Sequence, residues 1–229
     1  MTFGRTPVAW PADPRSRAAL ERHLAAREIQ PVLVDGGAPS FEAASNGRFG
    51  GVNADLRGAD LTGLDLGGAD LTGANLAGVR LVRARLDHAR LSGADLTAAN
   101  LSGAELARVE ADRIQAAGAA FRAAQLFAAD LVHAVLAGAD LRDALLNSAN
   151  LIGADLRGAD LRGASLRHCV LGTVAAPLRL AGARLDGVGL IGAVGCVSGA
   201  VAVGDAVLSG PALTAWLRDQ GCVVLNGSV

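Results

Sequence analysis

The chain of 229 residues carries 21 basic and 22 acidic residues, which leaves a net charge of −1. This balance excludes a strong overall attraction to nucleic acid or to anionic membranes. Apolar residues make up 51% of the chain and aromatic residues only 3%, so the core must be built mainly from aliphatic side chains. Three cysteines, Cys169, Cys196 and Cys222, are scattered without a CxxC pair, which favours reduced thiols and a cytoplasmic protein.

Residues 1–48 are expected to form an N-terminal helix and capping segment. Asp13 is a good N-cap and Pro14 suits the first helical turn, so a short amphipathic helix is predicted over residues 14–28. A short β segment is predicted at residues 30–34, before a glycine-containing turn. We expect the helix to pack beside the domain that follows, or alternatively to bind a partner. The first residues lack the apolar run of a signal peptide.

A five-residue pattern repeats from residue 54 to residue 173 without insertion or deletion. Its type unit is Ala54-Asp55-Leu56-Arg57-Gly58, and the 120 residues hold 24 units. The third position of each unit, called i here, is leucine almost throughout; Ala111, Ala116 and Phe121 are the exceptions. Position i−2 stays small or β-branched in those units as well, so the repeat is not broken there.

A period of five fits neither an α-helix nor a flat strand. On a helix each leucine would move by about 140° around the axis, and on a strand successive leucines would face opposite sides. A chain that turns a corner every five residues keeps i and i−2 inside and the other three positions outside, which predicts a solenoid. Glycine, frequent at i+2, suits such a corner. The residues predicted to line the core include Leu56, Leu61, Leu91, Phe121, Leu131 and Leu151, and Cys169 is expected to be buried at an i−2 position.

Four sides close one coil of 20 residues, so the 24 units form 24/4 = 6 stacked coils. At about 4.8 Å per coil, the rod would be about 29 Å long. We number the sides one to four by unit, starting with the unit of Ala54. The leucines then stack along the axis, and the small residues at i−2 fit a narrow interior.

The repeat becomes irregular after Thr173. Leu171 and Leu180 are nine rather than ten residues apart, so we expect a deletion or a changed corner near Pro177. Three further units follow at residues 178–192, and the pattern fades by residue 203. Because Phe49 already keeps the register, the repeat domain is assigned to residues 49–203, with about seven coils.

The last segment, residues 204–229, is expected to be a C-terminal helix and strand that either cap the solenoid or form a dimer interface. Pro211 begins a predicted helix that extends to about Gln220, and residues 222–225 are a predicted strand. Residues 187–204 carry no charge, but they are rich in glycine and continue the repeat. We therefore expect no transmembrane helix there.

The pattern Ala-[Asp/Asn]-Leu-x-x, seen in Ala54-Asp55-Leu56 and Ala59-Asp60-Leu61, resembles the pentapeptide-repeat family over more than half of the chain. The resemblance implies an all-β solenoid, a right-handed quadrilateral parallel β-helix, with short terminal α-helices here. It also implies two roles: a rigid protein-interaction scaffold, or a DNA mimic that protects DNA gyrase or topoisomerase IV from inhibitors. Terminal helices in some members form a homodimer.

The sequence offers no constellation for catalysis. Of the four histidines, His88 and His168 would lie on the same side but four coils apart, about 19 Å. His23 and His133 lie elsewhere, so no two could share a metal ion. The aspartates stand singly on the outside, and no phosphate-binding motif is present. We expect no enzyme activity, no metal and no cofactor.

The DNA-mimic hypothesis requires an acidic surface. Sorting the outward charges of residues 54–173 by side gives net charges of −1, +1, 0 and −2 for sides one to four. No side resembles the dense charge of duplex DNA. Side four carries the candidate acidic strip, which consists of Asp70, Glu110, Asp112 and Asp130.

Several outward positions in the second half of the repeat are apolar, where polar residues are expected. A contiguous apolar patch often marks an interface. The sequence therefore predicts a protein contact, either a self-interface or cover by a terminal helix, and leaves chance placement open. The candidate interface residues are Phe127, Val132, Val135, Leu145, Ile152 and Trp216.

Overall fold

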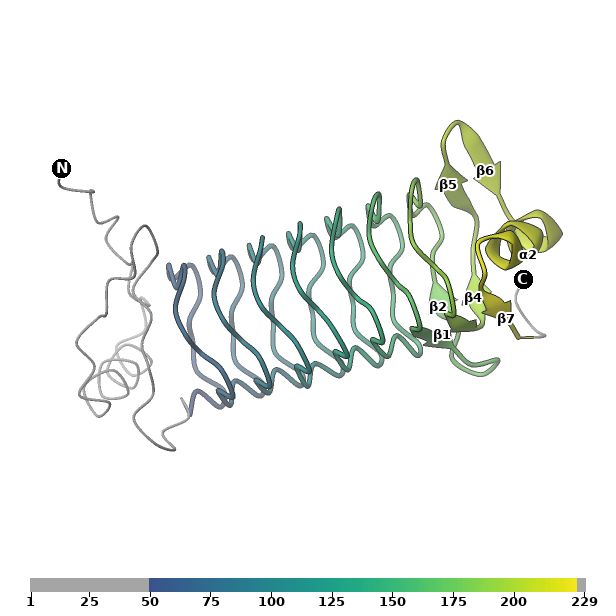
Figure 1. The fold of residues 1–229 in the computed structure, drawn as a ribbon. Coiled ribbons are helices and arrows are strands. Elements are labelled where there is room, and N and C mark those ends of the chain that lie inside the picture. Colours follow the sequence, from purple (N-terminus) through teal and green to yellow (C-terminus); the bar gives the residue numbers. More distant parts are fainter. Residues whose placement is uncertain (1–49, 226–229) are drawn as a thin grey trace.

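The computed structural model describes residues 50–225. The helix predicted at residues 14–28, the β segment at 30–34 and Phe49 lie outside the described residues. The described chain winds into a rod of stacked coils, with a helix and several short strands at its C-terminal end (Figure 1).

Each corner of the rod is a tight turn formed by positions i+1 and i+2. In the first complete unit the amide of Ala59 donates to the carbonyl oxygen of Leu56 over 3.1 Å, which closes a turn around Arg57 and Gly58. Gly58 has a φ of 63°, and the i+2 residue has a positive φ in every unit from Asn53 to His168. A positive φ at this position is typical of a type II turn. Glycine is frequent at i+2 because it adopts this conformation without strain.

Successive coils are joined by parallel backbone pairing at a spacing of 20 residues. The amide of Leu56 donates to the carbonyl of Asn75 and the amide of Asn75 donates to the carbonyl of Ala54, each over 2.8 Å. This pairs Asp55 with Asn75, and the same arrangement recurs on all four sides. The i−1 residues of each side therefore form an outward-facing ladder, which on side four runs through Gly50, Asp70, Arg90, Glu110, Asp130, Asn150 and Val170.

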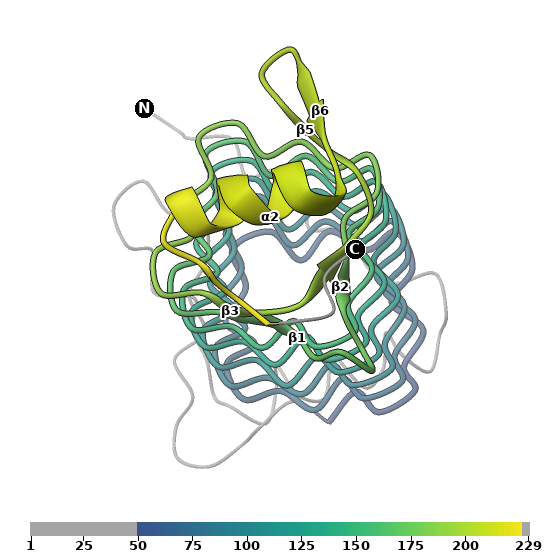
Figure 2. The ribbon, with the colours of Figure 1, turned by 90° about the vertical axis from the view of Figure 1, so that its right-hand side faces the viewer.

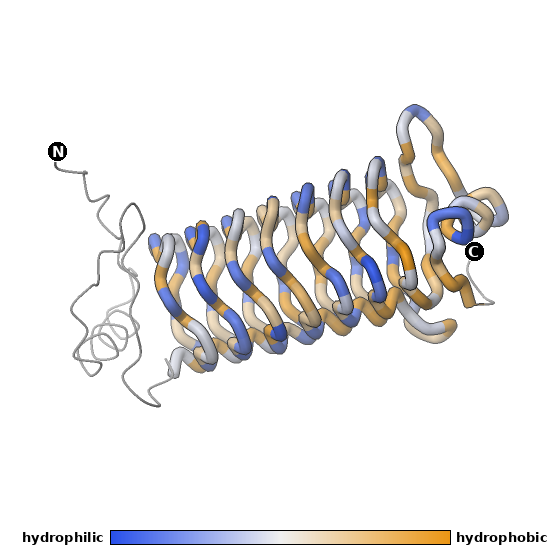
Figure 3. Tube along the Cα trace, viewed as in Figure 1, coloured by the Kyte–Doolittle hydropathy of each residue, from blue (hydrophilic) through white to orange (hydrophobic). Residues whose placement is uncertain are grey.

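The core is a column of leucines and small residues inside the coils. Leu56, Leu61, Leu91, Phe121, Leu131 and Leu151 are each at most 2% exposed, and Cys169 is buried. Ala111 and Ala116 occupy the two i positions directly before Phe121, on successive sides, so one larger ring accompanies two smaller side chains. Apolar residues recur along every coil (Figure 3).

The irregularity after Thr173 is a changed corner that contains an insertion; of the two predicted alternatives, the deletion is wrong. Asn150 pairs with Val170 at the usual spacing of 20, but Asp155 pairs with Arg179 at a spacing of 24. The interval from Leu171 to Leu180 thus spans one side, which normally takes five residues, rather than two sides. Four additional residues form a loop between strands β1 (Val170–Gly172) and β2 (Leu178–Arg179). The sequence shows the spacing between leucines but not the side of the coil on which each leucine lies.

The coils end in elements of a different kind. Strands β3 (Val194–Gly195) and β4 (Val197–Ser198) continue the solenoid, with β3 parallel to β1 and β4 parallel to β2. Strands β5 (Val201–Val203) and β6 (Ala206–Leu208) form an antiparallel hairpin that projects from the rod (Figure 1). Its two-residue turn, Gly204-Asp205, is a hairpin signal that the sequence analysis missed.

Helix α2 (Gly210–Asp219) lies across the C-terminal end of the coils (Figure 2). Its Leu213 and Leu217 are buried and belong to the core, while Trp216 packs against the core and is only partly buried. Strand β7 (Val223–Val224) then pairs in parallel with β3, so one sheet has the order β1-β3-β7. Within residues 50–225, no helix is both long and apolar enough to span a membrane.

Candidate protein-interaction surface

Aspartates at i−1 are tied to the turn that follows them. The carboxylate of Asp60, for example, accepts a hydrogen bond from the amide of Thr62 over 3.1 Å. Where arginine occupies i+1, its guanidinium also folds back onto the same carboxylate: the pairs Asp55–Arg57, Asp140–Arg142, Asp155–Arg157 and Asp160–Arg162 each show an Nε–Oδ1 distance of 2.8 Å. The sequence Asp-Leu-Arg therefore encodes a closed ion pair on the outer wall.

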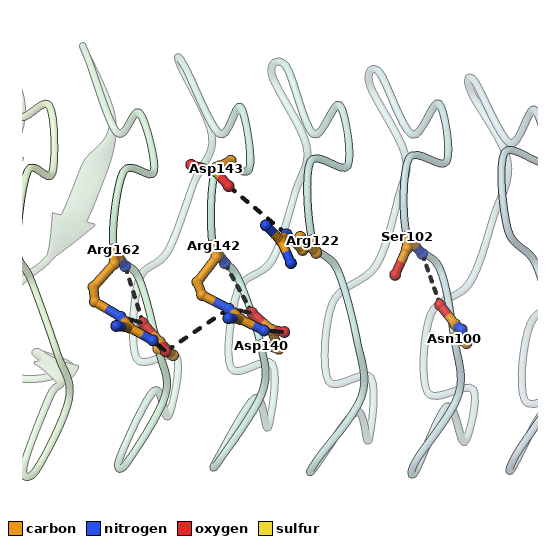
Figure 4. A network of polar contacts seen from close by, with 8 residues as sticks. Asn100, Ser102, Arg122, Asp140, Arg142, Asp143 and Arg162 are labelled. Carbon is orange, nitrogen blue, oxygen red and sulfur yellow. Dashed lines mark hydrogen bonds and ion pairs between the residues drawn. The ribbon is translucent and has the colours of Figure 1, made fainter.

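Two of these pairs lie in adjacent coils of side two (Figure 4). Arg142 also reaches Asp160 of the next coil at 3.9 Å, and Arg122 lies 3.8 Å from Asp143. Hydrogen bonding by Arg142 holds the pKa of Asp140 below its ordinary value, and Arg162 does the same to the pKa of Asp160. Both carboxylates therefore stay ionised and neutralised by their arginines, so this surface presents little net charge.

Arginines of the first coils are held between acids of the coils on either side. Arg85 lies 2.9 Å from Asp65 and 3.3 Å from Glu105. These arginines are about half exposed, so each pair contributes little to stability. Their main effect is to alternate the sign of the charge along the ladder.

Three of the four carboxylates of the candidate acidic strip on side four are paired with arginines. Arg90 lies 3.1 Å from Asp70 and 3.4 Å from Glu110, and Asp112 lies 3.7 Å from Arg113. The hydroxyl of Ser92 also donates to Asp112. Asp130 accepts a hydrogen bond from the amide of Val132 over 3.3 Å. The four carboxylates lie on one side, but two arginines are interleaved with them.

The six candidate interface residues do not lie on one surface. Phe127 and Leu145 lie on side three in adjacent coils and are exposed, at 48% and 45%. Val132 and Ile152 share the i+1 position on side four and are half-buried, whereas Val135 belongs to the ladder of side one. Trp216 lies on α2 at the end of the rod.

A larger apolar surface lies around the corner between sides three and four, toward the C-terminal end. We call it the apolar corner and define it by six exposed residues. On side three these are Phe127, Leu145 and Ile191; on side four they are Val170, Val194 and Val223.

The three valines of the apolar corner are paired in register along the sheet β1-β3-β7. The sequence analysis missed them and Ile191, although valine at an i−1 position, normally aspartate or asparagine, was the available signal. Val194 and Val223 could not be recognised as outward residues, because the regular repeat ends before them.

Carboxylates are scarce in this region of the described chain, and Asp130, in the same coil as Phe127, is the last of them. Side three has no acidic residue after Glu105, and side four has none after Asp130. Its polar groups are instead amides, hydroxyls, the imidazoles of His133 and His168, and the guanidinium of Arg167. The side-chain oxygen of Asn147, next to Phe127 in the following coil, accepts from the Ser165 hydroxyl over 2.6 Å and from the Arg167 amide over 3.3 Å. Three Asp-Leu-Arg pairs lie on sides one and two beside this region, at Asp140–Arg142, Asp155–Arg157 and Asp160–Arg162.

Eight copies of a pentapeptide-repeat model match the chain, over residues 52–86, 74–110 and 124–163. The matched part of the chain belongs to the pentapeptide-repeat family. Residues 111–123, between the matched ranges, include Ala111, Ala116 and Phe121 in place of leucine, yet the same turns and ladders continue through them.

Several solved pentapeptide-repeat structures are similar to the chain. Trypsin-treated QnrB1, a plasmid-mediated fluoroquinolone resistance protein, is 18% identical, with 77% of this chain and 84% of that chain covered and a TM-score of 0.47. HetL, a regulator of heterocyst differentiation from Nostoc sp. strain PCC 7120, is 25% identical, with coverages of 92% and 90% and a TM-score of 0.36. A thylakoid-lumen protein of Arabidopsis thaliana is 27% identical, with coverages of 54% and 63% and a TM-score of 0.29. No curated protein sequence matches the chain.

The histidines of the pentapeptide repeats are separate from one another. A Cβ added to Gly153 would lie 2.3 Å from Nδ1 of His133, and one added to Gly192 would lie 2.4 Å from Nδ1 of His168, so each ring covers a glycine of the next coil. Among residues 50–225 no group of three or more potential metal ligands is assembled. Burial raises the pKa of the Cys169 thiol to about 12, which makes this cysteine a poor nucleophile at neutral pH.

Proposed function

We propose that this pentapeptide-repeat protein is a rigid, non-enzymatic scaffold that binds another protein through the apolar corner. The observation that carries this proposal is the placement of Phe127, Leu145, Ile191 and the valine ladder on two adjacent sides. Scattered exposed apolar residues are ordinary, but a contiguous group on one surface is typical of an interaction site.

The composition of the surrounding surface supports the same proposal. Protein interfaces have cores depleted of charge and enriched in aromatic residues and arginine, with a polar rim. The apolar corner has Phe127 as its aromatic residue and Asn147 and Arg167 beside it, and no carboxylate follows Asp130 on sides three and four of the described chain. A partner would therefore bury little unpaired charge when it covers this surface.

The architecture supports the rigid part of the proposal. Each coil is hydrogen-bonded to its neighbours on four sides, and the apolar core is continuous from Leu56 to Leu190. A preorganised surface loses little conformational entropy on binding. The backbone of each of the six residues of the apolar corner is hydrogen-bonded to a neighbouring coil, so these residues do not need to be ordered by a partner.

The alternative role, mimicry of DNA toward a type II topoisomerase, is less well supported by the charges. Asp70 and Asp130 are three coils apart, about 14 Å, and duplex DNA carries about eight charges over that length. The strip on side four provides four carboxylates, with Arg90 and Arg113 paired to three of them. We therefore favour the apolar corner over the acidic strip as the binding surface.

Sedimentation of the tagged chain in an extract of its native cells tests the proposal. Leu145→Asp places a charge in the apolar corner, whereas Gln115→Asp makes the same change at the equivalent ladder position of side one. The wild type and Gln115→Asp should sediment as a complex heavier than the 23.0 kDa chain, and Leu145→Asp should sediment alone. Identical behaviour of the two variants would contradict the proposal.

A further inference from the structure

Two arginines on side three stand beside the apolar corner without an acidic partner. Arg108 and Arg167 are exposed, and neither forms an ion pair with any residue in 50–225. This distinguishes them from Arg85, Arg90 and the Asp-Leu-Arg arginines. The remaining arginines without an ion pair in the described part, Arg83, Arg184 and Arg218, lie on side two and on α2.

Arg108 and Arg167 flank the exposed side chains of Phe127 and Leu145. The amide of Arg108 donates to the carbonyl of Phe127 over 2.8 Å, which places Arg108 one coil before it. Leu145 pairs with Ser165, two residues before Arg167. The two arginines are three coils apart, about 14 Å along the axis. Positive charge therefore borders an apolar centre at both ends.

We propose that the occupant of this surface is an acidic, apolar segment of a partner protein, with apolar side chains on Phe127 and Leu145 and carboxylates on Arg108 and Arg167. This rests on the proposed function. Arginine binds a carboxylate through two parallel hydrogen bonds, and such pairs are stronger than neutral ones. A separation of about 14 Å corresponds to about nine residues of helix or about four of strand.

The charges disfavour a second copy of the chain as the occupant. If two copies met through the apolar corner, each would bring the unpaired Arg108 and Arg167, whereas Asp130 is the only carboxylate on sides three and four of the described chain that no arginine already pairs. Arg108 or Arg167 of one copy would then face a like charge of the other, which is unfavourable at an interface. An acidic partner would replace this repulsion between arginines with attraction between arginines and carboxylates.

Selection from a random 16-residue peptide display library against the full chain tests the proposal. The selected peptides should be apolar and enriched in aspartate and glutamate, with acids about nine or about four residues apart. Their affinity is then measured by fluorescence anisotropy for the wild type and for Arg108→Glu and Arg167→Glu. Each substitution should weaken binding at least tenfold, and added salt should weaken it further.

Arg83→Glu is the matched control, because Arg83 is exposed, lacks an ion pair and has the same positive φ as Arg108, 54° against 55°. It should change the affinity less than twofold. Peptides without acidic enrichment, failure to select any binder, or equal losses in all three variants would overturn the proposal. Peptides that lose affinity with Leu145→Asp but not with the arginine variants would overturn it and leave the proposed function standing. Peptides insensitive to Leu145→Asp would count against both.

Discussion

The first and last coils of the rod share an interior and differ on the outside. Leu91 and Leu151 have the same i position on side four and are both buried. On the outside of that side, Arg90 in the early coil is ion-paired to two acids, whereas Asn150 and Val170 in the later coils have no charge. The repeat thus fixes which positions are inside and leaves the outer positions free to vary. Binding properties can change along the rod without any change in its core.

The largest expected effects come from the interior and should be equal in the two regions. Leu91→Ala and Leu151→Ala each leave a cavity in the same column and should each lower the free energy of unfolding by about 2–5 kcal/mol. Chemical denaturation with circular dichroism measures this. A loss of under 1 kcal/mol in either region would show that the column is not continuous.

A smaller effect is expected at the corners. Gly138→Ala places an alanine at φ 68° with no atom within 4 Å of its Cβ, and should cost about 1–2 kcal/mol. Gly153→Ala has a similar φ but meets the His133 ring, so its cost should be about 1 kcal/mol higher. The double variant Gly153→Ala/His133→Ala should return to the cost of Gly138→Ala. Equal costs in the two single variants would contradict the contact between His133 and Gly153.

The Asp-Leu-Arg pairs predict a pH dependence of stability on the charged sides. Hydrogen bonding by Arg157 lowers the pKa of the Asp155 carboxyl group below its ordinary value of 3.8. Because the folded pKa is the lower one, this stabilisation is present above about pH 4 and is lost as the pH falls further. The stability difference between the wild type and Asp155→Asn should therefore shrink between pH 6 and pH 2.5. A difference that stays constant would exclude this ion pair as its source.

The smallest effect on stability is expected at the apolar corner itself. Leu145 is exposed and has Gln125 and Ser165 as its ladder neighbours, so Leu145→Asp creates no like-charge contact. Its free energy of unfolding should stay within about 0.5 kcal/mol of the wild type. Thermal and chemical denaturation measure this directly. A loss above 2 kcal/mol would mean that Leu145 is part of the fold rather than of a binding surface.

Most of the repeat architecture could be read from the sequence because a period of five restricts the backbone to one solution. The leucine positions alone predict that Leu56 and Leu131 are inside and that Asp60 is outside. Prediction was weaker where the period ends. The four-residue insertion before Leu178 and the hairpin around Gly204 were not predicted, because the sequence does not show on which side of the coil these residues lie.

The binding surface could be predicted only in part for the same reason. Phe127 and Leu145 stood out as apolar residues at outer positions. Val170 and Val223 are 53 residues apart in the sequence, and only the pairing of β1, β3 and β7 brings them into one ladder. Whether Arg108 and Arg167 form ion pairs likewise depends on which side chains of the neighbouring coils lie beside them. Spacing in the sequence does not give this information.

Site-specific photo-crosslinking within a single coil tests the central claim most directly. Ala117, Arg122, Phe127 and Val132 occupy the same i+1 position on sides one, two, three and four. A photoreactive residue at each site in turn, in the native cells, should give a crosslinked partner from Phe127 and Val132 and none from Ala117 and Arg122. Equal yields from all four sides, or crosslinks only from Ala117 and Arg122, would contradict a binding surface on sides three and four.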